Sequence, residues 1–149
     1  MAATIVDPHK SSIGGLDANI MALIAYVGGA VIGWIPVLRY FAWLVPIVIF
    51  FMEKSSKFVK FHAAQASLLN VVGAVLSFIV YILLGGIIRA ANPYAALGTL
   101  AIVGLLITII SILITIFSII AVINAYKYKL YYIPIIGKLA EKLSAKMGA

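Results

Sequence analysis

The sequence lacks cysteine and is poor in acidic residues, and both deficits exclude classes of protein. With no Cys among 149 residues, the chain has no disulfide, no thiolate nucleophile and no Cys-ligated zinc or iron–sulfur site. Only 4 residues are Asp or Glu, against 11 Lys or Arg, so paired carboxylates are scarce. Charged residues make up 10% of the chain and hydrophobic residues 65%, where soluble domains have about 25% and about 45–50%. This composition indicates a one-domain integral membrane protein.

Long apolar runs lie between the few charges of the central region. Between residues 19 and 126 the charged residues are Arg39, Glu53, Lys54, Lys57, Lys60 and Arg89. The runs after Lys60 exceed the roughly 18 to 20 apolar residues that indicate a transmembrane helix. A single helix over residues 18–52 would be about 52 Å long, against a hydrocarbon core of about 30 Å, and Pro36 interrupts it. Whether residues 18–52 form two spans, or one broken or re-entrant span, stays open.

We predict an all-α fold, a four-helix integral membrane bundle with a short C-terminal amphipathic surface helix. Residues 1–17 form a polar N-terminal lead-in, and residues 18–126 form the transmembrane domain. Its helices are expected at about 18–34, 38–52, 56–89 and 95–125. Ser55 or Ser56 is the expected N-cap of the third helix, and Ala91-Asn92-Pro93-Tyr94 is the expected turn before the fourth.

The distribution of Lys and Arg predicts the orientation of the chain. If the N-terminus, the loop at 53–60 and the C-terminus share one side, that side carries all nine Lys residues, and the other keeps Arg39 and Arg89. This asymmetry predicts a multi-pass protein of the cell membrane with both termini in the cytoplasm. We expect the lysines to contact anionic headgroups rather than nucleic acid. The membrane-surface set is Lys54, Lys57, Lys60, Lys127, Lys129, Lys138 and Lys142.

The cytoplasmic segment 127–149 contains a helical pattern after Pro134. Apolar residues fall on one face at helical spacing: Ile136, Leu139, Ala140, Leu143 and Met147. Lys138, Glu141 and Lys142 lie mostly elsewhere on this helix. The pattern predicts an amphipathic helix on the membrane surface, and the alternative is a frayed, solvated tail.

Small and hydroxylated residues recur along the apolar helices. Gly104, Thr108, Ser111, Thr115 and Ser118 form a stripe on the fourth helix, and Ala25, Gly29 and Gly33 a shorter one on the first. Such stripes allow helices to approach closely, so they indicate packing seams or, on the fourth helix, a polar seam facing a substrate path. Asn70 and Asn124 place amides in apolar helices, where each should face protein, as a structural bond or a substrate contact.

The polar segment from Glu53 to Asn70 is the other candidate site. In a helix, His62 and Gln65 share a face, with Phe61 beside them. A histidine there could carry protons or sense pH, or it could be an interfacial hydrogen-bonding residue. No second ligand lies at metal-binding spacing, and no nucleophile is paired with a base, so we predict no metal, no cofactor and no enzymatic activity.

Two stretches carry a family resemblance. EKSSKFVKFHAAQASLLN, with Phe61, His62 and Gln65, resembles the loop-to-helix signature of small bacterial and archaeal membrane proteins related to the twenty-kilodalton subunit of the chloroplast Tic translocon. AYKYKLYYIPIIGKLAEK, with Pro134 and Gly137, resembles their closing element. The resemblance implies a four-helix membrane domain and a link to protein translocation.

We therefore expect a non-catalytic protein-import or translocation component that binds polypeptides or partner helices. A structural or accessory subunit of a larger membrane complex is the alternative, and a small-solute channel or transporter is the third reading. The expected partners are the lipid bilayer, other membrane proteins or translocating polypeptides, and a second copy of the chain. The residues predicted to contact them are Phe61, His62, Gln65, Asn70, Thr108, Ser111, Thr115 and Asn124.

Overall fold

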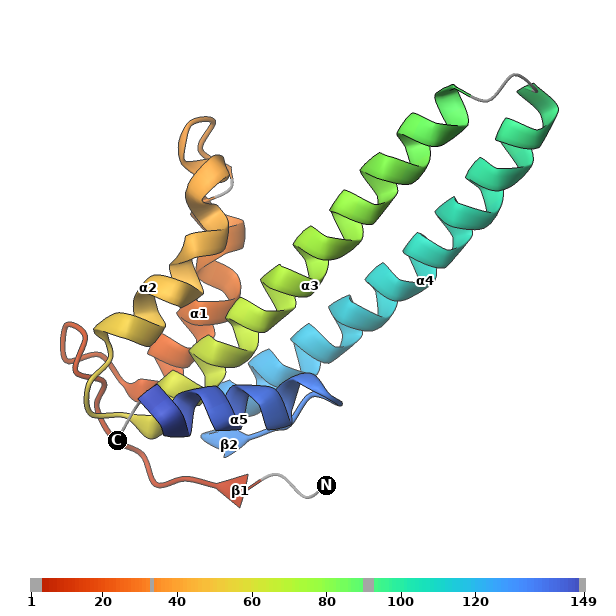
Figure 1. The fold of residues 1–149 in the computed structure, drawn as a ribbon. Helices are drawn as coiled ribbons and strands as arrows, with labels where there is room; N and C mark the ends of the chain where they lie inside the picture. The colour runs from red at the N-terminus through yellow and green to blue at the C-terminus, as the bar shows by residue number, and fades with distance from the viewer. Residues whose placement is uncertain (1–3, 33, 90–92, 148–149) are drawn as a thin grey trace. The chain divides into compact units, whose positions relative to one another are not determined.

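The computed structural model describes residues 4–32, 34–89 and 93–147, and this part of the chain is predominantly helical (Figure 1). Its α-helices are α1 (Ala18–Ile32), α2 (Val45–Met52), α3 (Lys57–Ile88), α4 (Pro93–Tyr126) and α5 (Ile136–Met147). A 3₁₀ helix, η1 (Leu38–Leu44), leads directly into α2. Two short strands, β1 (Thr4–Ile5) and β2 (Lys129–Leu130), pair antiparallel with Thr4 opposite Leu130. The predicted helical class is confirmed, and the small sheet is an addition to it.

Two of the four predicted spans have the length of a membrane crossing. α3 has 32 residues and α4 has 34, or about 48 and 51 Å at 1.5 Å per residue. Their apolar parts, Lys57–Gly86 and Leu97–Tyr126, are long and apolar enough to cross a membrane. α1 has only 15 residues, about 22 Å, and the predicted helix 38–52 is divided into η1 and α2. A bundle of four full-length spans is therefore not confirmed.

The helix ends follow local chemistry. Ser56 is the N-cap of α3, because its Oγ accepts a hydrogen bond from the backbone N–H of Val59 at 3.1 Å. α4 begins at Pro93 rather than at the predicted residue 95, which agrees with the preference of proline for the first helical position. The preceding Ala91 and Asn92, part of the predicted turn, lie outside the described residues.

The chain divides into two compact units. The first unit comprises residues 1–70 with 117–149, and the second comprises residues 71–116, so α3 and α4 each contribute to both. The core of the first unit contains one face of α1, the beginning of α3 and the end of α4, including Ala18, Ala22, Val59, Ala63 and Ala125. Small side chains predominate in it, which allows the helices to pack closely.

The small-residue spacing of α1 packs within the chain. A Cβ placed on Gly29 would lie 2.7 Å from the carbonyl oxygen of Ala42 in η1, so only glycine fits this approach. One on Gly28 would lie 3.1 Å from a methyl group of Val45 in α2. Gly29 of the predicted stripe thus packs against η1, and Gly28, which the stripe did not include, packs against α2. The last member of the stripe, Gly33, lies outside the described residues.

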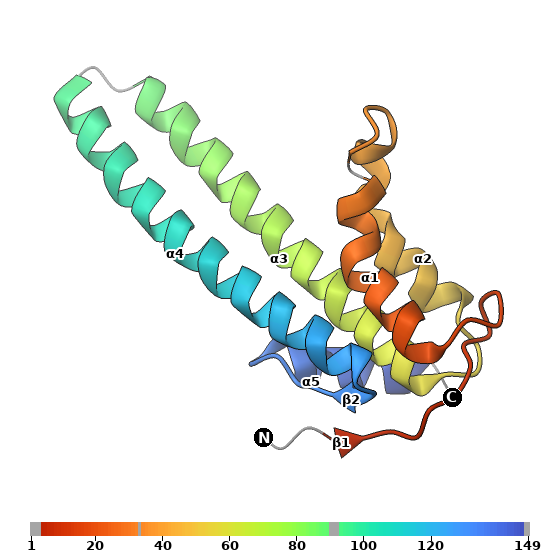
Figure 2. The ribbon, with the colours of Figure 1, turned by 180° about the vertical axis from the view of Figure 1, so that it is seen from behind.

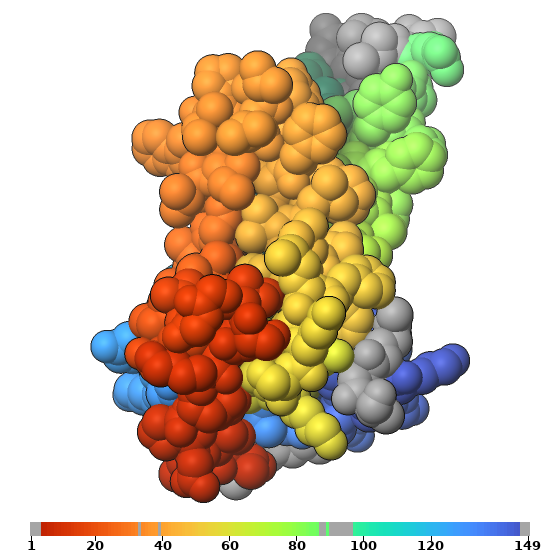
Figure 3. Space-filling view, turned by 90° about the vertical axis from the view of Figure 1, so that its left-hand side faces the viewer, coloured from red at the N-terminus to blue at the C-terminus, as the bar shows by residue number. Residues whose placement is uncertain are grey.

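The N-terminal lead-in is ordered against the rest of the first unit. After β1, residues 10–17 form a tight loop closed by a β-bridge between Lys10 and Asp17 and by their 2.7 Å ion pair. Gly14 and Gly15 turn this loop with φ of 63° and 65°, which glycine adopts without steric cost. In Figure 3 the N-terminal segment, red, lies directly against the yellow segment that joins α2 to α3.

The second unit consists of the adjoining parts of α3 and α4. No residue described between 71 and 116 is buried. A Cβ added at Gly73, Gly85, Gly86, Gly98 or Gly104 would meet no described atom within 4 Å apart from its chain neighbours and the nearby backbone of its own helix. The apolar surface of this unit is therefore available to lipid or to another protein.

Part of the predicted lipid-facing side of α5 packs on protein instead. Ala140 is fully buried in the core of the first unit, and Ile136 and Leu143 are half-buried. A Cβ on Gly137 would lie 2.6 Å from the Cα of Tyr132, so the first turn of α5 packs tightly against the preceding loop. Only Leu139 of the predicted face is largely exposed, and the side chain of Met147 is outside the described part.

Candidate functional site

A carboxylate, Glu53, organises the start of α3. It lies between α2 and α3 with a side chain that is 0% exposed. Its Oε1 accepts hydrogen bonds from the backbone N–H groups of Ser55 and Ser56, both at 3.0 Å. The basic residues that follow are unfavourable at a helix N-terminus, and a carboxylate there offsets them. Glu53 therefore stabilises the beginning of α3.

The same carboxylate holds the N-terminal segment. The Ser11 hydroxyl donates to Oε2, and the Ser12 hydroxyl donates to Oε1 at 2.7 Å. The Ser12 hydroxyl also accepts from the backbone N–H of Lys54 at 2.8 Å. Burial alone would raise the pKa of Glu53, but the bonds from Ser11, Ser12 and Ser56 outweigh it and lower the pKa from 4.5 to about 2. We name Glu53, Ser11, Ser12, Ser55 and Ser56 the carboxylate clamp.

A histidine extends this contact on the neighbouring side. His9 Nδ1 lies 2.8 Å from the carbonyl oxygen of Asp7, to which it donates as the N–H tautomer. His9 Nε2 then accepts from the Ser56 hydroxyl at 2.7 Å. The His9 ring also lies at the edge of Phe58, with 6.1 Å between ring centroids. Ser56 thus caps α3 and bonds the N-terminal segment at once.

His62 and Gln65, predicted from their spacing, form a second polar group inside the first unit. Gln65 Nε2 donates to Tyr26 Oη at 2.9 Å, and Tyr26 Oη lies 3.1 Å from His62 Nδ1. His62 Nε2 lies 3.2 Å from the carbonyl oxygen of Lys129. Because a carbonyl only accepts, Nε2 carries the proton, and Nδ1 accepts from Tyr26. The hydrogen bonds therefore run in one direction from Gln65 through Tyr26 and His62 to β2.

Gln65 also fixes the segment after β2. Its Nε2 donates to the carbonyl oxygen of Tyr131 at 3.2 Å, and its Oε1 accepts from the backbone N–H of Ile133 at 3.3 Å. Both His62 and Gln65 are fully buried. We name Tyr26, His62 and Gln65 the polar relay. Its atoms bond segments of the same unit, and these contacts give it a structural role.

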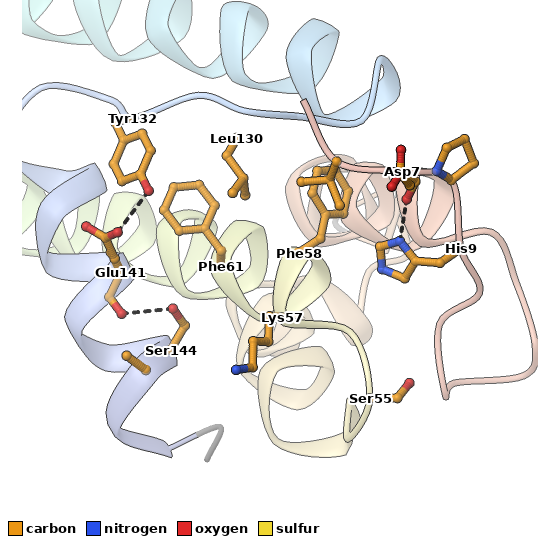
Figure 4. Close-up of a pocket in the computed structure, with 13 residues that line it drawn as sticks. Asp7, His9, Ser55, Lys57, Phe58, Phe61, Leu130, Tyr132, Glu141 and Ser144 are labelled. Carbon is orange, nitrogen blue, oxygen red and sulfur yellow. Dashed lines mark hydrogen bonds between the residues drawn. The ribbon is translucent and has the colours of Figure 1, made fainter. Parts of the chain in front are cut away.

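A cavity of about 690 Å³ opens beside these groups (Figure 4). Phe58, Phe61 and Leu130 form its apolar floor. Its residues come from the N-terminal segment, the start of α3, β2 and α5. Lys57, Asp7 and Glu141 bring charges of both signs to its edge. The predicted contact residue Phe61 contributes only a buried ring to this cavity, 4.9 Å from the ring of Tyr132.

One wall of the cavity is closed by a bond between the last loop and α5. Tyr132 Oη donates to Glu141 Oε1 at 3.0 Å. Burial, and then the hydrogen bond and charge of Glu141, raise the pKa of Tyr132. The phenol therefore stays protonated and continues to donate over the physiological range.

The remaining predicted contact residues lie apart from this group. Asn70 Nδ2 donates to the carbonyl oxygen of Trp43 at 3.2 Å and so ties α3 to η1. Asn124 Nδ2 donates to the carbonyl oxygen of Ile120, one turn earlier in α4. Thr108, Ser111 and Thr115 lie on an exposed face of the second unit. Of the eight predicted residues, Phe61, His62 and Gln65 lie together at this site, and Thr108, Ser111 and Thr115 lie together on α4.

Along α4, these three residues line a shallow groove of about 360 Å³ with Ile107, Ile112 and Ile116. The Thr108 hydroxyl donates to the Gly104 carbonyl oxygen, and the Thr115 hydroxyl to the Ser111 carbonyl oxygen, both at 2.8 Å. Such bonds within the helix satisfy the hydroxyls without a partner. The groove therefore presents side chains of which the Thr108 and Thr115 hydroxyls already donate within the helix.

The predicted membrane-surface lysines are exposed, except for two that are half-buried. Lys54, Lys57, Lys127, Lys138 and Lys142 are exposed, and Lys60 and Lys129 are half-buried. All belong to the first unit. Their contact with lipid stays a prediction.

Several long-range contacts that organise the first unit were not predicted. Ser11, Ser12, Tyr26 and Ser56 make bonds across 36 to 47 positions of sequence, which no local pattern indicates. Glu53 offered one signal, because it is a lone acid placed three residues before a serine-capped apolar helix. That spacing predicts a local cap, but not the contact with the N-terminal segment.

Comparison with known proteins assigns the chain to a family. A UPF0132 membrane protein of Methanocaldococcus jannaschii is 30% identical over 140 residues, which cover 91% of this chain and 94% of the relative. No solved structure matches. A family model of magnetosome magnetite crystal formation proteins, MamF/MmsF, matches residues 17–140.

These matches overturn the resemblance to the chloroplast import component. The two stretches that carried it, from Glu53 to Asn70 and from Ala125 to Lys142, lie largely inside the region matched by the MamF/MmsF model. The first stretch contributes Glu53, Ser55 and Ser56 to the carboxylate clamp and His62 and Gln65 to the polar relay. Its spacing therefore reflects internal contacts and does not identify an import component. The chain is a membrane protein that belongs to the MamF/MmsF family of magnetosome magnetite crystal formation proteins.

Proposed function

We propose that this protein is a non-catalytic accessory subunit whose second unit packs against the transmembrane helices of another membrane protein. The observation that carries this role is the groove on α4 lined by Thr108, Ser111 and Thr115. In lipid, helices associate through close packing of small residues, because apolar side chains gain little by leaving the acyl chains. A groove of small residues between isoleucines fits a helix in that way.

The internal bonding of the groove supports packing rather than transport. The hydroxyls of Thr108 and Thr115 bond to their own helix, so they offer little to a polar solute. A partner helix needs only the shape of the groove.

The polar groups of the first unit support a structural role for the rest of the chain. Glu53, His62 and Gln65 bond segments that are distant in sequence, and all three are buried. A residue that serves chemistry needs access to a substrate. These side chains instead support a rigid base for the two long helices.

We also propose that both termini lie on one side of the membrane, and the carboxylate clamp supports this topology. Ser11 and Ser12 bond Glu53, which supports a path in which the chain enters the membrane near residue 18 and returns to the same side by residue 53. A single crossing between those points is incompatible with these bonds. The pairing of β1 with β2, which follows α4, supports a C-terminal segment on that side as well.

The family's description concerns magnetite crystal formation. The arrangement of acidic residues in this chain does not support a role in binding metal ions for that process. Three of its 4 acidic side chains are engaged separately: Asp17 with Lys10, Glu53 with serines, and Glu141 with Tyr132. The described residues contain no group of three or more His, Asp or Glu that could hold a metal ion. The accessory role is supported by the groove instead.

The test fills the groove on α4 with larger side chains and leaves the first unit unchanged. Thr108→Leu with Thr115→Leu should lower recovery of the partner about tenfold, equivalent to about 1.4 kcal/mol, because the larger side chains prevent close approach. The matched control, Thr108→Val with Thr115→Val, keeps the shape and removes only the hydroxyls, so recovery should stay unchanged. The measurement is native mass spectrometry of complexes extracted in native-membrane nanodiscs.

Two results would contradict the accessory role. Recovery of the same partner at unchanged stoichiometry with the Leu variant would show that the groove is not its binding surface. Complexes that contain only copies of this chain would indicate a self-assembling protein instead.

A further inference from the structure

The outer edge of α5 carries an unusual apolar residue. Ile135, in the loop just before α5, is 88% exposed and has φ of 66°. A β-branched residue in this left-handed conformation is a genuine outlier, because glycine or asparagine adopts it at lower cost. An exposed isoleucine at such a turn gains nothing from contacts within the first unit.

The surrounding backbone fixes this residue in its outward position. The backbone N–H of Ile136 donates to the Pro134 carbonyl oxygen at 2.8 Å, and that of Gly137 donates to the Ile133 carbonyl oxygen at 2.7 Å. Gly137 is packed against Tyr132, and Ala140 is fully buried. The packing of Gly137 and Ala140 therefore fixes which side of α5 faces the protein. It also fixes which side faces away from it.

Apolar and cationic side chains are adjacent on that outer side. Leu139 is 48% exposed, and Leu143, one turn further along α5, is half-buried. Lys138, Lys142 and Lys146 are exposed next to them. An apolar edge flanked by lysines is the arrangement of helices that lie in a membrane interface, where the long lysine side chains reach the headgroups.

The position of α5 in the first unit agrees with such a surface. In Figures 1 and 2, α5 lies crosswise beside the beginning of α3. The apolar span of α3 starts there, at Lys57. If α3 crosses the membrane, a helix beside Lys57 lies at the boundary between headgroups and acyl chains.

We propose that Ile135 and Leu139 insert into the leaflet at this boundary while Lys138, Lys142 and Lys146 contact the phosphates of anionic lipids. The occupant of this surface is the lipid of the protein's own membrane. Burial of the Ile135 side chain in acyl chains offsets the cost of its left-handed backbone. This anchor is independent of the partner that binds the groove on α4, so either role can fail without the other.

Site-directed spin labelling of the full chain tests the anchor, and the absence of native cysteine makes single labels clean. Labels at Ile135→Cys and Leu139→Cys are compared with a matched label at Ala145→Cys, which is exposed on another side of α5. The protein is placed in nanodiscs of phosphatidylcholine mixed with phosphatidylglycerol. Collisions with oxygen, which concentrates in acyl chains, should exceed those with a water-soluble nickel chelate several-fold at 135 and 139. At 145 the nickel chelate should prevail.

Two further variants separate insertion from folding. Ile135→Gly removes the inserted side chain and relaxes the backbone, so melting in detergent should stay unchanged or rise, while the label at 139 moves toward water. Lys138→Glu with Lys142→Glu should shift the labels at 135 and 139 outward in discs with phosphatidylglycerol. Nickel access at 135 equal to that at 145 would overturn the anchor. Shielding of 135 from both reagents would also overturn it, since protein rather than lipid would then cover the residue.

Discussion

The two units of this chain differ in how their polar side chains are hydrogen-bonded. The first unit buries Glu53, His62 and Gln65 and joins them to distant segments through the carboxylate clamp and the polar relay. In the second unit, the described residues 71–116 include none that is buried, and the hydroxyls of Thr108 and Thr115 bond within α4. The first unit is held by specific contacts, whereas the second depends on its surroundings, which for apolar helices are lipid and partner helices. Substitutions should therefore be costly in the first unit and tolerated in the second.

The largest difference is expected at Glu53. Glu53→Gln replaces a charged acceptor and places an amide N–H group toward the donors Ser11 and Ser12. The contact between the N-terminal segment and residue 53 should therefore be destabilised by about 3 to 5 kcal/mol, and the segment should detach more often. Hydrogen exchange of the Ser12 amide in detergent micelles measures this opening. Glu141→Gln is the matched control, because its carboxylate is exposed and the change should cost less than about 1 kcal/mol. Equal protection in the two variants would show that the clamp does not hold the segment.

Lowering the pH should weaken the same clamp gradually. The pKa of Glu53 is lowered from 4.5 to about 2, so its contribution to stability is complete above about pH 4.5 and decreases as the pH falls toward 2. Acid unfolding, followed by intrinsic fluorescence from pH 6 down to pH 2, should show this dependence in the wild type. The Glu53→Gln variant should lack the loss of stability between about pH 4.5 and pH 2 that protonation of Glu53 causes. If the two proteins unfolded over the same range of acidic pH, a group other than Glu53 would control the transition.

A comparable contrast is expected between glycines of the two units. Gly137→Ala should destabilise the first unit by about 2 to 3 kcal/mol, because the new Cβ would lie 2.6 Å from the Cα of Tyr132. Gly104→Ala should be neutral or stabilise α4 by up to about 1 kcal/mol, since the new Cβ would meet no described atom within 4 Å beyond the adjacent part of α4, and alanine favours helix. Thermal unfolding in detergent measures both. Similar melting temperatures for the two variants would remove the distinction between the units.

The smallest effect tests the polar relay. Tyr26→Phe keeps the ring but removes the hydroxyl between Gln65 and His62, which leaves a buried acceptor at Nδ1 and should cost about 1 to 2 kcal/mol. Ser77→Ala, which removes a hydroxyl bonded only to its own helix at Gly73, should change stability by less than about 0.5 kcal/mol. The two melting temperatures, measured in the same detergent, give the comparison. A larger loss from Ser77→Ala would contradict the internal role of the relay.

Local features of the sequence predicted the elements well and their contacts poorly. The apolar runs predicted α3 and α4 within two residues at each end, and Ser56 was one of two predicted caps. Residues 1–17 were predicted to be only a polar lead-in, because their partners at 53–56 and 128–130 are distant in sequence. His62 and Gln65 were correctly placed on one face of a helix, but their spacing is equally compatible with a contact site and with internal bonding.

By itself, the sequence determined that this chain is an apolar helical membrane protein, because hydropathy and the scarcity of charge act locally along the chain. It also determined the family, because the match extends over residues 17–140. Only the tertiary structure decided that Glu53 holds the N-terminal segment, that His62 and Gln65 are internal, and that Ile135 faces outward. The physical reason is that a hydrogen bond depends on distances of about 3 Å between groups whose approach is set by packing of the whole unit.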